Sequence, residues 1–385
     1  MQPEKKYIML ERKLLIAIKN MFFQGKAIIL IGARQTGKTT LLKQLETDFS
    51  ENEVLFLNCD EPEVIKLLTN ASSTELRQLI GTRKLVFIDE AQRVVNIGIT
   101  IKLMIDNIAG IQIIVSGSSA IGIRDKINES LTGRKIEYQL YPFSLQELIN
   151  AGSLLEEKRL LERRIIYGTY PEVINNPDKA QKILIELTNS YMYKDILEYK
   201  NIRRSDMLNK LLTALSLQLG NEVNFNELGR LVGINNETVM RYLDLLEKVF
   251  IIFRLPSFSR NIRQELKKSQ KVYFYDNGIR NALIQNFKSL DLRTDTGALW
   301  ENFIICERKK YNEYNENYVN QYFWRTHAHQ EIDYIEEKDG MLYAFEIKWN
   351  EKRRAKFPNS FAQTYPNHEF KVINRTNYLE FCGIN

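Results

Sequence analysis

The first 140 residues predict an α/β fold, a parallel sheet with helices on both faces. Short apolar strands alternate there with helical segments, which is the pattern of a parallel sheet. A glycine-bearing loop follows the first strand and opens a helix, and an acidic pair ends the third strand. The five expected strands are Ala27 to Ile31, Val54 to Asn58, Lys84 to Glu90, Ile111 to Val115 and Lys135 to Leu140.

The glycine-bearing loop matches the pattern G-x-x-x-x-G-K-[ST]. Its glycines let the backbone curl so that N–H groups point at phosphate oxygens. In this pattern Lys38 reaches the β- and γ-phosphates, and the Thr39 hydroxyl binds Mg²⁺. We therefore expect ATP and Mg²⁺ as cofactors. The expected nucleotide-binding residues are Gly32, Ala33, Arg34, Gln35, Thr36, Gly37, Lys38, Thr39 and Thr40.

Asp89 and Glu90 end the third strand, at the sheet edge where ligands bind in open α/β sheets. We expect Asp89 to hold Mg²⁺ and Glu90 to polarise the attacking water. Ser116 ends the fourth strand, where a polar side chain can sense the γ-phosphate. The alternative for Asp89 and Glu90 is that they are two solvated acids at the end of a strand, without a role in catalysis.

Two arginines beyond the fourth strand, Arg124 and Arg134, are candidates for an arginine finger, which completes the ATP site of a neighbouring subunit. Arg134 is favoured because it directly precedes the last strand. This prediction implies a homo-oligomer, and a surface ion pair is the alternative.

Bulk properties set the limits of these predictions. The length of 385 residues suggests two or three domains. The net charge of +6 permits a nucleic-acid partner without requiring one. The three scattered cysteines have neither disulfide nor zinc spacing. The sequence predicts no signal peptide and no membrane span, so we expect a cytoplasmic protein.

A helical segment follows the sheet, and a helix-turn-helix pattern follows that segment. Phe225 to Val232 and Asn236 to Lys248 predict two helices joined at Gly233, with two later strands as a wing. In a nucleic-acid interpretation, the second helix reads the major groove and the basic loop contacts phosphates. The residues concerned are Asn235, Asn236, Thr238 and Arg241 for the groove, and Arg260 and Arg263 for phosphates.

A winged helix that only packs or binds a protein is an equal alternative to the nucleic-acid interpretation. Asp244 and Glu247 on the second helix favour this alternative, because acidic groups repel phosphates.

Two strand-like segments near the C-terminus predict a hairpin. The Asp339-Gly340 pair between them favours a two-residue turn. The turn fixes a register that separates polar from apolar cross-strand pairs, whereas a slip of one residue would mix them. One face would pair Asp333 with Glu346 and Glu331 with Lys348, and the other Ile332 with Ile347 and Tyr334 with Phe345.

The polar face of this hairpin suggests metal chemistry. Opposed carboxylates such as Asp333 and Glu346 repel unless a proton or cation lies between them. With Lys348 they form a set known from metal-dependent nucleases, in which acids bind Mg²⁺ and the lysine positions or activates water. Glu301 is a further candidate metal ligand. The alternative is a solvated face with a Glu331–Lys348 ion pair.

Taken together, these motifs resemble the bacterial and archaeal AAA-type (AAA+) ATP-binding proteins that carry a C-terminal domain of unknown function 4143. The resemblance covers nearly the whole chain. Ala33 stands where the family usually has proline, and Thr169 where it usually has a second glycine. The motifs that carry the resemblance are GARQTGKTTLL, LVFIDEAQRV, IVSGSSA, SLTGRK, LYPFSLQEL, YGTYPEV, YKDI, GALWENFI, EIDYI and FEIKW.

The resemblance implies an AAA+ P-loop ATPase domain (1–140), a helical lid or linker (141–220), a winged-helix domain (221–285) and a PD-(D/E)XK nuclease-like domain (286–385). Its nuclease pattern maps onto Glu301, Asp333, Glu346 and Lys348. We therefore expect an ATPase coupled to a DNA-facing C-terminal half that includes a metal-dependent nuclease. The alternatives are a nucleotide-gated switch whose nuclease-like domain is inactive, and a remodeller that acts only on proteins.

Overall fold

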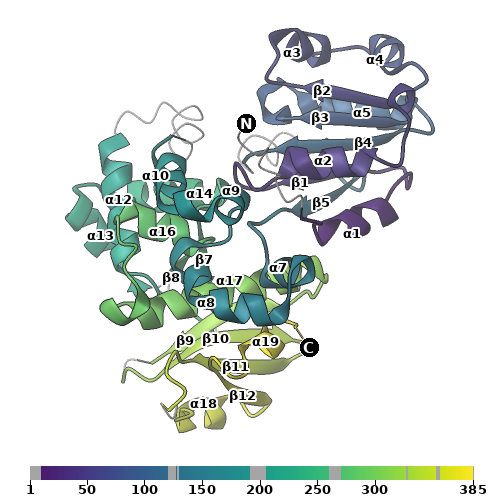
Figure 1. Ribbon diagram of the computed structural model, residues 1–385. Helices are drawn as coiled ribbons and strands as arrows, with labels where there is room; N and C mark the ends of the chain where they lie inside the picture. Colours follow the sequence, from purple (N-terminus) through teal and green to yellow (C-terminus); the bar gives the residue numbers. More distant parts are fainter. Residues whose placement is uncertain are drawn as a thin grey trace, which may run out of the picture. The chain divides into compact units, whose positions relative to one another are not determined.

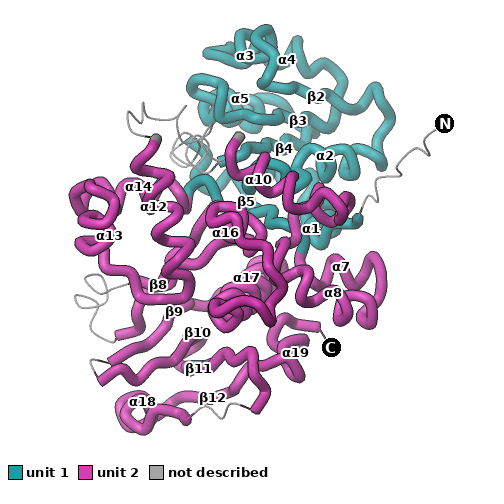
Figure 2. Tube along the Cα trace, turned by 60° about the vertical axis from the view of Figure 1, so that its left-hand side comes forward, with its two compact units in different colours: residues 1–143, 195–201, 248–250 teal, residues 144–194, 202–247, 251–385 magenta. Residues whose placement is uncertain are grey.

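The computed structural model divides into two compact units (Figure 2). The first unit is essentially Met1–Phe143, and the second holds most of the remaining chain. The residues that the structure describes are 10–119, 127, 130–190, 205–259, 270–326, 328–352 and 356–384.

The first unit contains a five-stranded parallel sheet in the order β2-β3-β4-β1-β5 (Figure 1). Every residue of β1, β3 and β4 is buried, so these central strands are covered on both faces. This confirms the predicted α/β sheet. The strands are β1 (Ala27–Ile31), β2 (Val54–Asn58), β3 (Leu85–Asp89), β4 (Gln112–Gly117) and β5 (Lys135–Gln139).

Helices connect these strands. Helix α2 follows the P-loop and packs against α1 and β3, while α4 packs against α5. Helix α3 was not predicted; it begins at Pro62, and Val64 and Leu68 bury one face of it. The helices are α1 (Leu14–Asn20), α2 (Lys38–Glu46), α3 (Pro62–Leu68), α4 (Ser73–Ile80) and α5 (Ile97–Asn107).

The second unit begins with helices, as predicted. They are α7 (Leu145–Ala151), α8 (Leu154–Tyr167), α9 (Pro171–Asn175), α10 (Ala180–Ser190) and α12 (Ser205–Leu217). Two more helices, α13 (Phe225–Val232) and α14 (Asn236–Lys248), have the predicted bounds. Gly233 ends α13 with a positive φ of 80°. An antiparallel sheet accompanies them in the order β6-β8-β7, formed by β6 (Glu222–Val223), β7 (Ile252–Pro256) and β8 (Gln270–Phe274).

The C-terminal part of the second unit is a four-stranded sheet with helices. The sheet order is β12-β11-β10-β9. Its strands are β9 (Asn320–Arg325), β10 (Glu331–Lys338), β11 (Met341–Ile347) and β12 (His368–Ile373). Helix α16 (Asn277–Leu283) packs mainly against α10 and α8, and the helices of the C-terminal part are α17 (Thr296–Tyr314), α18 (Asn359–Thr364) and α19 (Tyr378–Phe381).

The β10–β11 hairpin has the predicted register. Tyr334 lies opposite Phe345. Asp339 and Gly340 both have positive φ, 52° and 78°, as a two-residue hairpin turn of this kind requires. The register against β9 shifts by one residue between Ile332 and Ile335, which is a β-bulge in β10.

The bulge corrects one expectation from the sequence. Ile332 and Tyr334 were expected to share an apolar face. Instead Ile332 packs in a core cluster with Ile335, whereas Tyr334 contacts Phe345 and Phe381. The extra residue of a bulge changes the alternation of side chains along the strand, and the hydrophobic pattern did not reveal it.

A buried amide fastens α17 to β8. Asn302 accepts a hydrogen bond from the Phe274 N–H at 2.8 Å and donates to the Phe274 carbonyl at 2.9 Å. Its Nδ2 also donates to Asn277 Oδ1 at 2.7 Å. Since Glu301 precedes Asn302, these bonds fix the position of Glu301 relative to β8.

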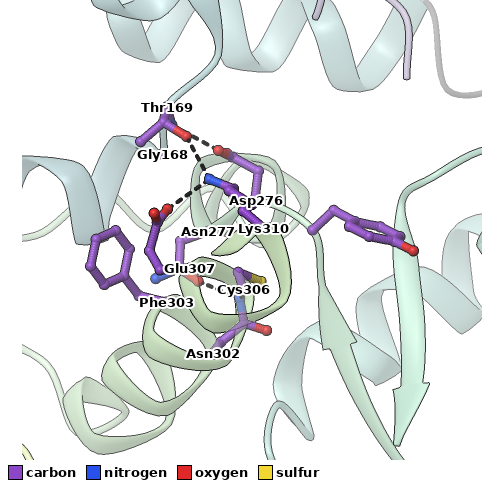
Figure 3. Close-up of a pocket in the computed structure, with 10 residues that line it drawn as sticks. Gly168, Thr169, Asp276, Asn277, Asn302, Phe303, Cys306, Glu307 and Lys310 are labelled. Carbon is purple, nitrogen blue, oxygen red and sulfur yellow. Dashed lines mark hydrogen bonds and ion pairs between the residues drawn. The ribbon is translucent and has the colours of Figure 1, made fainter. Parts of the chain in front are cut away.

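A narrow polar pocket lies beside this contact (Figure 3). Thr169, Asp276, Glu307 and Lys310 point toward one another in it. Lys310 Nζ lies 2.7 Å from Glu307 Oε1, and the Thr169 N–H donates to Asp276 Oδ2 at 2.8 Å. A Cβ on Gly168 would lie 1.9 Å from Asp276 Oδ1, so only glycine fits there. These bonds give part of the YGTYPEV motif a structural role.

We predict that Asp276 makes stability depend on pH. Burial raises the pKa of Asp276 from 3.8 to about 6, although the Thr169 N–H and Lys310 act against the shift. The unfolded chain therefore loses this proton at lower pH than the folded chain. The contribution of Asp276 to stability should be complete below pH 4 and should be lost as pH rises through 6, a change of about 3 kcal/mol.

The measurement is the free energy of unfolding at several pH values for wild type and Asp276→Asn. The asparagine variant should lack this fall, although it costs a constant amount because its NH₂ group cannot replace one of the two oxygens of Asp276 that accept backbone N–H bonds. Asp178→Asn, which removes an exposed aspartate, is the control. Parallel pH curves for wild type and Asp276→Asn would contradict the prediction.

Candidate functional site

The P-loop has the backbone of an anion site. Gly37 adopts a positive φ of 93°, and α2 begins directly after it at Lys38. No side chain caps this helix end, so its first N–H groups are suited to hold phosphate oxygens. A Cβ on Gly32 would lie 2.2 Å from the Leu140 carbonyl oxygen. The first glycine is therefore needed for the close packing of the loop against the end of β5.

Lys38 is held inside the loop. Its ammonium group donates hydrogen bonds to the Gly32 and Ala33 carbonyl oxygens, both at 2.9 Å. Arg12, which sequence analysis missed, donates to the Thr36 carbonyl at 2.9 Å and to the Tyr141 carbonyl at 2.5 Å. Arg12 thereby ties the loop to the segment that follows β5. No local pattern marks this arginine, because its partners lie far along the chain.

Asp89 is the centre of the candidate magnesium site. It is 5% exposed, and its Oδ2 accepts a hydrogen bond from Thr39 Oγ1 at 3.0 Å. Its Oδ1 accepts from the Ser116 hydroxyl and from the Glu90 N–H. A hydroxyl beside a carboxylate is a donor set that suits a hydrated Mg²⁺. The structure thus brings together Thr39, Asp89 and Ser116 from three different elements.

Glu90 lies next to this site in a strained conformation. Its φ is 52°, which is uncommon for a residue other than glycine and is found often at functional sites. Glu90 Oε2 accepts hydrogen bonds from Ser118 Oγ at 3.0 Å and from Gln92 Nε2. Sequence analysis missed both partners, although each lies only two residues from a predicted site residue.

Arg134 lies at the opposite edge of the sheet from the P-loop. Its carbonyl accepts a hydrogen bond from the Ala27 N–H, at the start of β1, whereas the P-loop follows the end of β1. The guanidinium pairs with Asp106 at 2.8 Å on the surface. Within one chain Arg134 is therefore remote from the P-loop, and its role toward a neighbouring subunit stays a prediction. Arg124 lies outside the described residues.

The C-terminal carboxylate cluster consists of Glu301 on α17, Glu331 and Asp333 on β10, and Glu346 on β11. Lys348 joins two of them, with Nζ 2.5 Å from Glu346 Oε1 and 3.4 Å from Asp333 Oδ2. The residues expected as metal ligands, together with Lys348, therefore converge. Burial and the Asp333 charge raise the pKa of Glu346 above its ordinary value, while Lys348 lowers it.

Lys271 of β8 enters the same cluster, and sequence analysis missed it. Its side chain is 2% exposed, with Nζ 2.5 Å from Glu331 Oε1, 3.2 Å from Glu301 Oε1 and 3.9 Å from Asp333 Oδ1. Tyr273 Oη also donates to Glu301 Oε1, at 2.6 Å. Burial lowers the pKa of Lys271, but the three carboxylates outweigh it and the net shift is upward.

These contacts decide whether the cluster fits a divalent metal. An Mg²⁺ ion needs carboxylate oxygens at about 2.0–2.1 Å. Here the oxygens of Asp333 already accept the Ile347 N–H and lie beside the ammonium groups of Lys348 and Lys271. Among the described residues no group of three or more His, Cys, Asp or Glu is arranged to hold a metal. With Lys271 in place, the residues present do not fit a metal.

The helix predicted to read DNA, α14, carries a polar capping residue at its start and two acidic residues further along. Asn235 Oδ1 accepts the Thr238 N–H at 2.8 Å, so Asn235 caps the helix. Asp244 and Glu247 both pair with Arg254 of β7, and Arg254 Nη2 lies 2.6 Å from Asp244 Oδ1. One arginine thus partly compensates the two acidic groups, and the Asp244 side chain stays 54% exposed. Arg260 and Arg263 lie outside the described residues.

The fold and the P-loop geometry define a nucleotide-binding protein of the AAA type. The family model described as "AAA domain" matches residues 24–149. The models "Domain of unknown function (DUF8612)" and "Domain of unknown function (DUF4143)" match residues 158–290 and 296–382. The chain therefore carries an AAA domain and a C-terminal domain of unknown function 4143, as the motifs predicted.

Curated relatives match over most of this chain. Uncharacterized protein MJ1544 of Methanocaldococcus jannaschii is 24% identical over 354 residues, which cover 86% of this chain and 77% of the relative. Uncharacterized protein Rv2008c of Mycobacterium tuberculosis is 24% identical over 337 residues, which cover 86% and 72%.

Solved structures are only distantly similar. A chain in the "Structure of Drosophila ORC bound to AT-rich DNA and Cdc6" aligns over 71% of this chain and 89% of its own length, with 12% identity and a TM-score of 0.27. This score says nothing about what the present chain binds. Within the described residues, no helix is both long enough and apolar enough to span a membrane.

Proposed function

We propose that this protein is an ATP-hydrolysing switch whose nucleotide state controls a DNA-facing second half that does not cut DNA. The observation that carries the ATPase proposal is the meeting of Thr39, Asp89 and Ser116, with Glu90 adjacent. Neutral donors surround the Asp89 carboxylate, so its charge is available to a cation. This arrangement suits Mg²⁺-ATP rather than a solvated strand end.

Each residue has a definite task in this proposal. The Lys38 ammonium, now bonded to loop carbonyls, would donate to phosphate oxygens instead. Thr39 and Asp89 would hold the hydrated Mg²⁺. Glu90 would accept the proton of the attacking water once Ser118 and Gln92 release its carboxylate. Bound ATP supplies the phosphoanhydride bond whose hydrolysis drives the switch.

We predict that Glu90→Gln abolishes hydrolysis without abolishing ATP binding. The amide cannot accept a proton, so the rate should fall by at least about 10²-fold. Lys38→Ala should instead lose ATP binding. Phosphate release and fluorescent-nucleotide titration measure the two properties separately. Arg93→Ala, an exposed neighbour in the same segment, is the control. Normal turnover by Glu90→Gln would remove Glu90 from the proposed mechanism.

The DNA-facing part of the proposal is supported by the helix-turn-helix and the strand pair after it. Arg254 pairs with both Asp244 and Glu247, so these acids repel phosphates less than two unpaired carboxylates would. Asn236 and Arg241 are exposed on α14, where they can reach DNA. If the protein has no affinity for DNA, a protein partner is favoured instead.

We predict that Arg241→Ala weakens binding to duplex DNA. Loss of one phosphate contact should reduce the slope of log affinity against log salt by about one. Fluorescence anisotropy over a salt series, with ATP and without, measures this slope. Arg159→Ala removes an exposed arginine from α8, outside the helix-turn-helix, and should leave the slope unchanged. Equal slopes for wild type and Arg241→Ala would exclude α14 as the contact.

We also predict that the pure protein does not cleave DNA, because Lys271 and Lys348 already occupy the C-terminal carboxylate cluster. The assay is incubation of supercoiled plasmid and linear duplex with Mg²⁺ or Mn²⁺, with and without ATP, beside Asp333→Ala. Cleavage that disappears in Asp333→Ala would instead establish the other candidate, a metal-dependent nuclease. The convergence of Glu301, Asp333, Glu346 and Lys348 is the observation that favours that candidate.

A further inference from the structure

Lys271 is an unusual residue for its location. An ammonium group that is removed from water is very unfavourable unless opposite charges compensate it. Lys271 is 2% exposed, and three carboxylates of the cluster lie within 4 Å of its Nζ. Its ammonium also lies 5.6 Å from the centre of the Phe323 ring, an additional favourable contact for a cation.

The carboxylates of the cluster need a nearby cation just as Lys271 needs nearby carboxylates. Glu301 is 13% exposed and Asp333 9%, so water compensates them poorly. Burial raises the pKa of Glu301, Lys271 lowers it, and the neighbouring Asp333 raises it. Removal of Lys271 would leave several negative charges facing one another across α17, β10 and β11.

The position of Lys271 is fixed by the fold rather than by a flexible surface chain. Its residue belongs to β8, which pairs with both β6 and β7. Asn302 bonds to the Phe274 backbone three residues further along β8, and Tyr273 bonds to Glu301. The position of Lys271 is therefore fixed both by the neighbouring strands of β8 and by the bonds between β8 and α17.

We infer that Lys271 is the resident cation of the C-terminal carboxylate cluster, in the place that a divalent metal would otherwise take. The cluster is then complete without metal, and it fastens β8 of the helix-turn-helix segment to α17 and β10. This inference deepens the proposed function, because it rests on a C-terminal half that binds rather than cuts. It does not depend on ATP hydrolysis.

The experiment measures Mn²⁺ binding to the full-length protein without nucleotide, by the electron paramagnetic resonance signal of free Mn²⁺. Wild type and Asp333→Asn should bind the same number of Mn²⁺ ions, because the cluster of the wild-type protein binds none. Lys271→Met should gain one site, with affinity at least about tenfold above wild type, equivalent to about 1.4 kcal/mol. The double variant Lys271→Met/Asp333→Asn should lose that site again.

Two variants serve as controls. Lys271→Arg keeps a cation in the cluster and should gain no Mn²⁺ site. Lys310→Met removes a lysine of similar burial, 3% exposed, from the pocket beside Asp276 and Glu307. It should gain no site, because fewer carboxylates surround it. A gain in Lys310→Met equal to that in Lys271→Met would overturn the inference.

Two further results would overturn it. One is a wild-type Mn²⁺ site that Asp333→Asn removes, and the other is a folded Lys271→Met that gains none. If Lys271→Met does not fold, wild type decides: excess Mn²⁺, compared with chelator, should shift the unfolding midpoints of wild type and Asp333→Asn by the same amount, because any shift then comes from the Asp89 site. An upward shift with Mn²⁺ that Asp333→Asn abolishes would show that a metal occupies the cluster. ATP turnover, measured separately, tests the proposed ATPase alone.

Discussion

The strand order β2-β3-β4-β1-β5 is the constraint on which the nucleotide site depends. Because β4 lies between β1 and β3, the ends of all three strands meet at one edge of the sheet. The P-loop follows β1, Asp89 ends β3 and Ser116 lies in β4, so these residues meet although they are far apart in sequence. The sheet is buried on both faces at its centre, and the polar groups are therefore confined to this edge.

The second unit depends on buried polar contacts in a different way. Asp276, Asn277, Asn302 and Lys310 bond to backbone or to one another where α16, α17 and β8 meet. Each such group is costly to bury unless it has a partner, so the network permits one arrangement of these elements. Gly168 and Gly278 fit it because a Cβ at either position would overlap Asp276 or the Tyr167 carbonyl.

Local patterns predicted the features that local geometry determines. The glycine spacing predicted the P-loop, and the Asp339-Gly340 turn predicted the register that brings Asp333 near Glu346. The bulge in β10, Arg12 and Lys271 were not predictable in this way. The contacts of Arg12 and Lys271 join segments distant in the sequence. A bulge changes which face of the strand a side chain occupies, but it leaves the pattern of residue types in the sequence almost unchanged. A single sequence contains no signal for such pairings.

The two acidic sites differ in what surrounds the carboxylates. At Asp89 the donors are two hydroxyls and one backbone N–H, all neutral, so the negative charge remains for a cation to compensate. At Asp333 the neighbours include two ammonium groups, which already compensate much of the negative charge of the cluster. Coulomb attraction between buried opposite charges is strong, so a metal would have to displace lysines that the fold holds in place. An acidic motif therefore indicates a metal only when the neighbouring strands bring no cation of their own.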